Sequence, residues 1–227
     1  MAAVRRRVLD VETEQGLARA HVSRPPHAGG TLVIGHGAGG GIDVPALVQA
    51  GEAALAAGWA VAWVEQPWRV AGRRVAVAPP RLDDAWLTVV RTVRTGRSAL
   101  PGALVLGGHS AGARVACRTA SGLGAVGVLA LSFPLQPPAG RLSRAPELGL
   151  APGRLLVVQG WRDPFGGPEE IRAALLGGGA SPRLQRPRTG VVVGVEGTHA
   201  LRPGPDLAAA VTGFLRRCQE GGRAGAE

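Results

Sequence analysis

The sequence contains no lysine, asparagine or tyrosine, only three isoleucines and only two cysteines among its 227 residues. Two cysteines do not make a disulfide framework, and Cys117 and Cys218 both stand in apolar patterns typical of helices. No apolar run reaches the roughly 18 residues that a membrane span requires, and the basic N-terminus lacks the apolar stretch of a secretory signal. These absences predict a cytoplasmic protein, in a reducing compartment, that does not enter a membrane.

The net charge of +10 comes from arginine alone, because the chain has no lysine. Lysine, asparagine, tyrosine and isoleucine have AT-rich codons, so their joint scarcity indicates a GC-rich genome rather than selection for phosphate binding. The arginines are also spread along the chain and do not form a stripe with interleaved aromatic residues. We therefore expect no nucleic-acid partner.

Apolar runs alternate with helical patterns along the chain. After an opening hairpin, strands are expected at residues 31–34, 59–64, 103–107, 125–131, 154–159 and 191–195. Helices are expected at residues 45–57, 81–93, 113–120, 168–176 and 206–218. This alternation predicts an α/β fold with a mostly parallel sheet and helices on both faces. No segment is long enough for a large lid. The sequence therefore predicts a single domain over residues 1–219 and a flexible tail over residues 220–227.

The segment Gly108-His109-Ser110-Ala111-Gly112 follows one of these strands and precedes a helix. A strand, a Gly-x-Ser-x-Gly turn and a helix, in that order, are the sequence form of a nucleophile elbow, which lifts the serine hydroxyl above the edge of a sheet. The chain has 36 glycines, so the pattern alone is weakly specific and depends on its context. Ser110 is the candidate nucleophile for attack on a carbonyl.

A serine becomes a good nucleophile only when a histidine takes its proton and an acid fixes that histidine's tautomer. After a nucleophile elbow, the acid and then the histidine follow in the chain, each on a loop at the carboxyl end of a strand. Asp163 and His199 occupy such positions, in that order. Glu196 is an alternative acid, but its place three residues from His199 leaves poor room for the two side chains to converge. We therefore favour Asp163.

Catalysis at a carbonyl also needs backbone N–H groups that point at the oxygen carrying negative charge in the tetrahedral intermediate. Ala111, directly after the serine at the start of a helix, is expected to supply one of them. The other is expected from the glycine-rich segment after the strand at residues 31–34. Ala38 is favoured there, with Gly37 and Gly39 as alternatives that would also line the substrate site.

A dinucleotide-binding loop is the main alternative for this glycine-rich segment. Residues 35–40 also fit Gly-x-Gly-x-x-Gly after a strand, and Glu65 ends the next strand. However, residues 41–45 delay the helix, whereas that fingerprint needs helix N–H groups directly under the pyrophosphate. No Gly-Lys-Ser or Gly-Lys-Thr sequence occurs, which excludes a P-loop. We expect no cofactor and no metal. Trp68 and Trp161, on expected loops at the active edge, are candidates for the pocket wall.

Five segments resemble the small lidless α/β-hydrolases of the dienelactone-hydrolase-like group, particularly the branch with testis-expressed hydrolase-like proteins. They are Gly35-His-Gly-Ala-Gly-Gly, Gly107-Gly-His-Ser-Ala-Gly-Ala-Arg114, Leu131-Ser-Phe-Pro-Leu, Gln159-Gly-Trp-Arg-Asp-Pro-Phe-Gly and Gly197-Thr-His. The resemblance implies an α/β-hydrolase fold, a triad of Ser110, His199 and Asp163, and no cofactor. The chain departs from true dienelactone hydrolases in having serine rather than cysteine as the nucleophile, which puts that substrate in doubt.

The expected function is that of a serine hydrolase acting through an acyl-enzyme on a small ester, thioester or lactone. Its expected partner is a small-molecule substrate, and the sequence does not indicate an oligomeric state. Some relatives in the branch are complex subunits without an assigned activity, so a non-catalytic scaffold is one alternative. A dinucleotide-binding oxidoreductase is the other.

Overall fold

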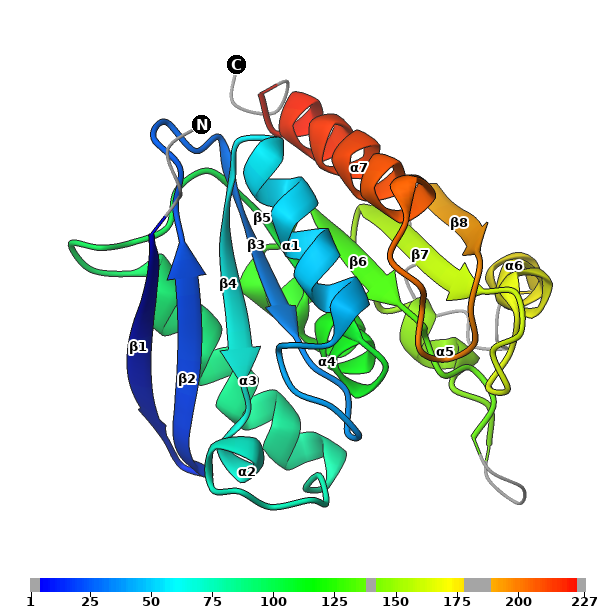
Figure 1. Ribbon diagram of the computed structural model, residues 1–227, viewed down its shortest axis with the longest axis horizontal. Helices are drawn as coiled ribbons and strands as arrows, with labels where there is room; N and C mark the ends of the chain where they lie inside the picture. The colour runs from blue at the N-terminus through cyan, green and yellow to red at the C-terminus, as the bar shows by residue number, and fades with distance from the viewer. Residues whose placement is uncertain (1–4, 138–141, 178–188, 224–227) are drawn as a thin grey trace.

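The computed structural model describes residues 5–137, 142–177 and 189–223. Within them the chain forms an eight-stranded sheet flanked by helices (Figure 1). The strands are β1 (Arg6–Thr13), β2 (Gly16–Ser23), β3 (Gly30–Gly35), β4 (Trp59–Glu65), β5 (Ala103–His109), β6 (Gly127–Leu131), β7 (Arg154–Gly160) and β8 (Thr189–Val195). Their order across the sheet is β1-β2-β4-β3-β5-β6-β7-β8. The β1–β2 and β2–β4 pairs are antiparallel and the other neighbouring pairs are parallel, which confirms the mostly parallel sheet.

Helices cover both faces of the sheet, as the sequence predicted. Helices α1 (Pro45–Ala56) and α7 (Pro205–Arg223) pack on one face. The other face carries α3 (Pro79–Arg94), α4 (Ala111–Thr119), α6 (Pro168–Gly177) and the short helix α5 (Ala145–Leu148). A second short helix, α2 (Pro67–Val70), and the 3-10 turn Ser121–Leu123 complete the described elements.

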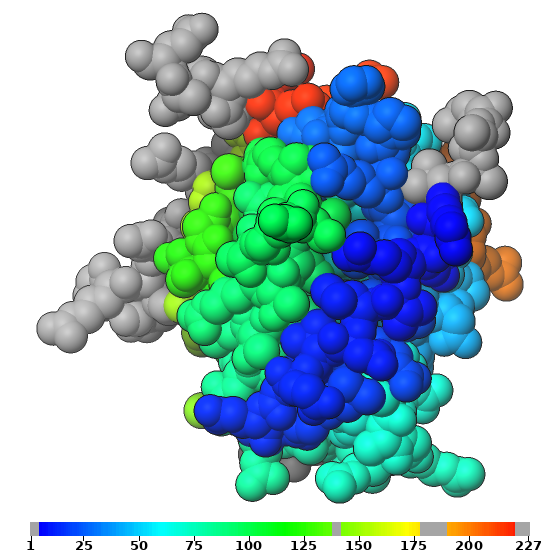
Figure 2. All heavy atoms as spheres, turned by 90° about the vertical axis from the view of Figure 1, so that its left-hand side faces the viewer, coloured from blue at the N-terminus to red at the C-terminus, as the bar shows by residue number. Residues whose placement is uncertain are grey.

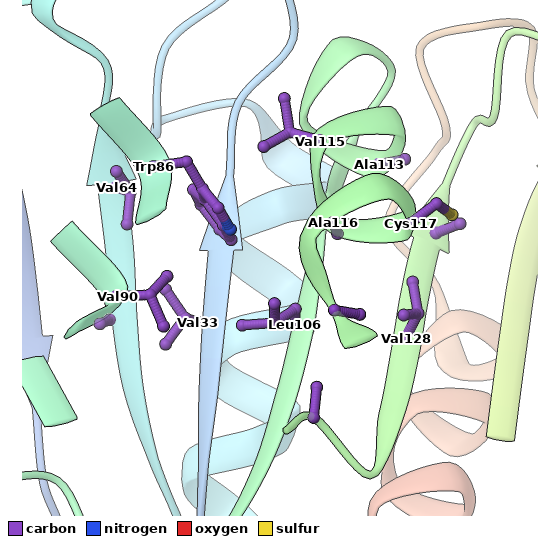
Figure 3. Packing of buried hydrophobic residues seen from close by; sticks show 14 of the residues in the cluster. Val33, Val64, Trp86, Val90, Leu106, Ala113, Val115, Ala116, Cys117 and Val128 are labelled. Carbon is purple, nitrogen blue, oxygen red and sulfur yellow. The ribbon is translucent and has the colours of Figure 1, made fainter. Parts of the chain in front are cut away.

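Each buried strand divides its apolar side chains between two cores, because successive residues point to opposite faces. In β3, Leu32 and Ile34 belong to the core under α1 and α7, whereas Val33 belongs to the core under α3 and α4. Figure 3 shows Trp86 and Val90 of α3 over Val33. Burial on both faces explains why these strands are apolar throughout instead of alternating with polar residues.

An antiparallel hairpin forms one edge of the sheet. Thr13 pairs with Gly16, so two residues form its loop, and Gly16 has a φ of +104° that favours glycine. The Thr13 hydroxyl donates a hydrogen bond of 2.7 Å to the Gly16 carbonyl oxygen. Figure 2 shows β1 exposed along this edge beside α3. The hairpin therefore lies at the opposite edge of the sheet from β7 and β8.

Several elements differ from those expected, most by one or two residues at an end, such as α3, which begins at Pro79, and β6, which begins at Gly127. The helix after the serine turn begins at Ala111, two residues earlier than predicted. The region expected to be a loop between β4 and α3 contains α2, so Trp68 stands on a helix. Helix α7 continues to Arg223, which makes residues 220–223 helical, whereas residues 224–227 lie outside the described residues. Glycines near the end of a helix weaken it without stopping it, which explains the misplaced boundary.

The two cysteines are free and lie in different cores. Cys117 on α4 packs on one face of the sheet and Cys218 on α7 packs on the other. Burial raises the pKa of both thiols to about 12, so neither forms a reactive thiolate near neutral pH. The prediction that these cysteines do not form a disulfide framework is confirmed.

Candidate active site

Ser110 lies in the turn between β5 and α4 with a φ of +54° and a ψ of −110°. Such strained conformations cost a residue other than glycine about 1–3 kcal/mol and persist only where the surroundings fix them. The Ser110 N–H donates to the Leu131 carbonyl oxygen of β6 at 2.9 Å. A Cβ at Gly108 would lie 2.6 Å from the Gly35 carbonyl oxygen, and one at Gly112 would lie closer still to that oxygen. Both motif glycines are therefore required by the close approach of the end of β3.

A hydrogen-bonded chain links three side chains that are distant in the sequence. His199 Nε2 lies 2.8 Å from Ser110 Oγ, and His199 Nδ1 lies 2.9 Å from Asp163 Oδ2. Because an ionised carboxylate only accepts hydrogen bonds, Nδ1 carries the proton and Nε2 is free to accept the serine proton. Asp163 follows β7 and His199 follows β8, at the carboxyl edge of the sheet. Glu196, the alternative acid, is exposed, and Asp163 is the residue that contacts the imidazole.

The side chain of Asp163 is fully buried, and three N–H donors converge on its carboxylate. Besides His199, the Phe165 backbone N–H donates to Oδ1 at 2.9 Å and Gln159 Nε2 donates to Oδ2 at 2.9 Å. Gln159 is itself buried, and its Oε1 accepts from the Phe133 N–H at 2.9 Å, which fixes the amide orientation. Gln159 was not among the predicted site residues. The signal available was a polar residue at the end of the apolar strand β7.

His109 was also missed, although it stands inside the serine motif. Its Nε2–H donates to the backbone carbonyl oxygen of His199 at 2.8 Å. His109 is buried, and burial lowers the pKa of its imidazole, which favours the neutral form with a single N–H. The ring of Phe165 packs edge-on against the His199 imidazole, with 4.7 Å between ring centroids. His199 is therefore held both through its backbone and through its ring.

A buried histidine orients the glycine-rich loop after β3. His36 Nδ1–H donates to the Gly37 carbonyl oxygen at 2.8 Å, and Nε2 accepts from the Gln66 N–H at 3.1 Å. Burial lowers the pKa of His36, which favours the neutral form that this acceptor role requires. In a trans peptide a carbonyl and the following N–H point in opposite directions, so the Ala38 N–H points away from His36. The loop passes close to the serine, because a Cβ at Gly37 would lie 3.1 Å from Ser110 Cβ.

The other predicted site residues differ in their surroundings. Trp68 is buried and packs edge-on against His36 with 5.4 Å between ring centroids. Gly39 is exposed, and a Cβ there would meet no atom within 4 Å. Trp161 is 50% exposed, and its ring lies against Gly194 of β8. The structure therefore brings Trp68 next to the glycine-rich loop and leaves open space where a side chain at Gly39 would stand.

Within residues 5–137, 142–177 and 189–223, no three histidine, cysteine, aspartate or glutamate side chains gather as metal ligands would. Among the helices of that same part of the chain, none combines the length and apolar composition needed to cross a bilayer.

Comparisons with known proteins identify the fold and the family. Residues 28–203 match the family described as "Alpha/beta hydrolase domain". A lidless α/β serine hydrolase from Xanthomonas campestris is 21% identical, with 93% of this chain and 94% of that chain covered and a TM-score of 0.68. A dienelactone hydrolase from Anabaena variabilis is 14% identical, with 94% and 98% covered and a TM-score of 0.71. The esterase Pf2001 from Pyrococcus furiosus is 14% identical, with 96% and 94% covered and a TM-score of 0.75.

At these sequence identities the likeness to the solved structures is one of fold. A search of curated proteins found no match. The family match spans well over half of the chain and includes Ser110 and His199. The strand order and the serine turn agree with it, and the described residues contain no large lid. The chain therefore belongs to the α/β-hydrolase domain family.

Proposed function

We propose that the protein is a serine hydrolase that cleaves a small carboxylic ester, thioester or lactone through an acyl-enzyme. The observation that carries this proposal is the distance of 2.8 Å between Ser110 Oγ and His199 Nε2, with Asp163 bonded to the other ring nitrogen. Membership of the α/β-hydrolase family supports it.

In the proposed reaction, Ser110 Oγ attacks the substrate carbonyl carbon as its proton passes to His199 Nε2. The Asp163 carboxylate stabilises the resulting imidazolium. The imidazolium then protonates the leaving alcohol or thiol as the bond from the carbonyl carbon breaks, which leaves an ester on Ser110. His199 next takes a proton from water, and the hydroxide attacks this ester. The acid is released and the serine hydroxyl is restored.

Two backbone N–H groups are proposed to stabilise the negative oxygen formed at each step. Ala111 is the first residue of α4, where N–H groups have no partner within the helix. Ala38 is favoured for the second donor. His36 bonds to the Gly37 carbonyl oxygen, so the N–H of Ala38 in the same peptide points away from His36. Loss of one such donor costs on the order of 10²- to 10³-fold in turnover in related chemistry.

A panel of p-nitrophenyl esters of increasing acyl length tests the proposal. We expect wild-type protein to hydrolyse the shorter esters and Ser110→Ala to lose at least about 10³-fold in kcat. Ser132→Ala is the matched control, because Ser132 also follows a parallel strand with a positive φ but is fully buried. Equal activity in wild type and Ser110→Ala would contradict the proposal.

The alternatives predict different outcomes. A folded protein that hydrolyses no ester, thioester or lactone would favour a non-catalytic scaffold. Tight binding of NAD in calorimetry would favour a dinucleotide site. Helix α1 begins only at Pro45, beyond the glycine-rich loop, so its N–H groups do not start directly behind those glycines. That late start supports hydrolysis over dinucleotide binding.

A further inference from the structure

The loop that carries His199 is a short, closed turn. It runs from the end of β8 at Val195 to the start of α7 at Pro205. Gly197 and Leu201 pair across it as an isolated antiparallel bridge, and His199 stands midway between them. Leu201 is buried in the core under α1 and α7. The position of the His199 imidazole therefore depends on how this loop is attached to the rest of the molecule.

A glutamine on α1 binds the backbone at the end of this loop. Gln49 Oε1 accepts a hydrogen bond of 2.9 Å from the Gly204 N–H, and Gln49 Nε2 donates one of 3.0 Å to the Gly204 carbonyl oxygen. These partners fix the orientation of the amide, because an N–H only donates and a carbonyl oxygen only accepts. Both residues are half-buried. One side chain thus satisfies both polar groups of the Gly204 backbone.

The sequence around Gly204 makes this contact hard to replace. Gly204 lies between Pro203 and Pro205, which have no N–H, so it supplies the single backbone donor of these three residues. A half-buried N–H that loses its acceptor is unfavourable. Without the Gln49 amide, the end of the loop would therefore move to bring the Gly204 N–H to water.

Helix α1 is a firm support for this contact. Ala46, Leu47 and Ala50 of α1 are fully buried, and α1 lies beside α7 on one face of the sheet (Figure 1). The same helix follows the glycine-rich loop with Ala38, the favoured second oxyanion donor. Gln49 therefore links the helix after the proposed oxyanion loop to the loop that carries the proposed general base.

We propose that Gln49 is a positioning residue for His199, which keeps the imidazole within reach of Ser110 by holding Gly204. The proposal rests on the proposed hydrolase function. His109 holds the His199 carbonyl oxygen and Phe165 packs against the His199 ring, so Gln49 adds a third support at the end of the loop. Its side-chain hydrogen bonds within the described residues go to Gly204, away from the reacting atoms. Its effect therefore falls on turnover rather than on substrate binding.

Gln49→Met tests this role, because it removes both hydrogen bonds and keeps the length of the side chain. A displacement of about 1 Å at a reacting group can cost roughly 10²-fold in rate. We expect kcat on one p-nitrophenyl ester to fall about tenfold while KM stays within about twofold of wild type. Gln49→Glu keeps an acceptor for the Gly204 N–H, and negative charge is favourable at the start of α7. This variant should turn over at least about threefold faster than Gln49→Met.

Titration of the active serine distinguishes a displaced histidine from a partly unfolded sample. A fluorophosphonate forms an adduct with an activated serine, so the final adduct count gives the active fraction. We expect Gln49→Met to reach the same final count as wild type, but about tenfold more slowly. A merely structural role would give fewer labelled chains and an unchanged kcat per labelled chain.

Arg154→Met is the matched control. Arg154 Nε donates to the Arg217 carbonyl oxygen at 3.1 Å, so it ties the other end of α7 to the first residue of β7. This contact lies at the amino edge of the sheet, opposite the edge that carries His199. The control should keep kcat within about twofold of wild type. If Gln49→Met does not fold, Gln49→Asn replaces it, because the shorter side chain cannot reach both groups of Gly204.

Three results would overturn the role of Gln49 and leave the hydrolase proposal standing. The first is a kcat per labelled chain in Gln49→Met within twofold of wild type. The second is a Gln49→Glu variant no faster than Gln49→Met. The third is an equal loss in Arg154→Met, because the effect would then belong to the attachment of α7 in general. A folded wild-type protein that neither hydrolyses the p-nitrophenyl panel nor forms an adduct overturns both proposals.

Discussion

The residues of the proposed triad are each positioned by neighbours that take no part in the chemistry. His109 holds the backbone of His199, and Gln159 holds the carboxylate of Asp163. Ser110 is held by its own strained turn. A displacement of about 1 Å at a reacting group can cost roughly 10²-fold in rate. These neighbours are therefore expected to influence turnover more than substrate binding.

Asp163→Asn tests which acid orients the histidine. An amide at this position can donate to Nδ1, which would leave the proton on Nε2 and prevent it from accepting the serine proton. We expect kcat to fall on the order of 10³- to 10⁴-fold while the fold is retained. Glu196→Gln is the control, and its kcat should stay within about twofold of wild type. A larger loss in Glu196→Gln than in Asp163→Asn would show that the acid is wrongly assigned.

His109→Phe tests the role of the motif histidine in positioning. Loss of the hydrogen bond to the His199 carbonyl should lower kcat by about 10- to 100-fold and change KM little. His109→Gln keeps a side-chain donor and should recover part of the loss. Steady-state kinetics on one ester measures both parameters. Equal kcat in His109→Phe and wild type, or no difference between the two variants, would contradict this role.

At the scale of elements, the end of β3 packs closely against the start of α4, and this contact constrains the serine turn. The close approach leaves no space for a side chain at Gly112, because a Cβ there would collide with the Gly35 carbonyl oxygen. We expect Gly112→Ala to lower the free energy of unfolding by about 2 kcal/mol or more, as overpacking does elsewhere. Urea denaturation measures this change.

Gly122→Ala is the control for that substitution. A Cβ at Gly122 would meet no atom within 4 Å, so this variant should change the free energy of unfolding by no more than about 0.5 kcal/mol. If both variants are equally stable, the turn is not constrained by β3 in the way described.

The sequence predicts long elements better than short ones. Strands such as β4 are apolar throughout because both of their faces are buried, and that pattern is plain in the sequence. Helix α2 has only four residues, too few to show a helical period, and it was expected to be a loop. The end of α7 was also misplaced, because Gly221 and Gly222 resemble a stop that the helix passes through.

At the scale of the whole molecule, two buried histidines should make stability depend on pH. Burial lowers the pKa of His36 and His109 below the ordinary value of 6.5. At a pH between the pKa of the folded protein and that of the unfolded chain, the unfolded chain binds more protons. The free energy of unfolding therefore rises with pH in this range. The contribution of each neutral histidine to the free energy of unfolding is fully present above a pH of about 6.5. It is lost as the pH falls below 6.5, by at most about 1.4 kcal/mol per pH unit for each histidine.

Urea midpoints measured between pH 5.5 and 7.5 test this dependence. The midpoint should fall as the pH is lowered, and His36→Gln should reduce the slope. His27 is exposed, so His27→Gln should leave the slope unchanged. A midpoint that does not change over this range would contradict the account of His36 and His109.

The proximity of the three proposed triad residues could be predicted from the order of the motifs, whereas contacts between distant segments could not. Ser110, Asp163 and His199 follow strands whose carboxyl ends meet at one edge, so their proximity follows from the topology. No local pattern shows that His109 reaches the His199 carbonyl, or that Gln49 reaches the backbone of Gly204. The cytoplasmic location, the single domain and the lack of a cofactor stay predictions.

The central claim is that Ser110 is a nucleophile activated by His199 and Asp163. A fluorophosphonate probe, followed by mass spectrometry of the digested protein, tests it most directly, because the probe reacts with activated serines. We expect one adduct per chain, located on Ser110, with labelling abolished in Ser110→Ala and strongly slowed in His199→Ala. A folded wild-type protein that forms no adduct, or that forms one on another serine, would contradict the account.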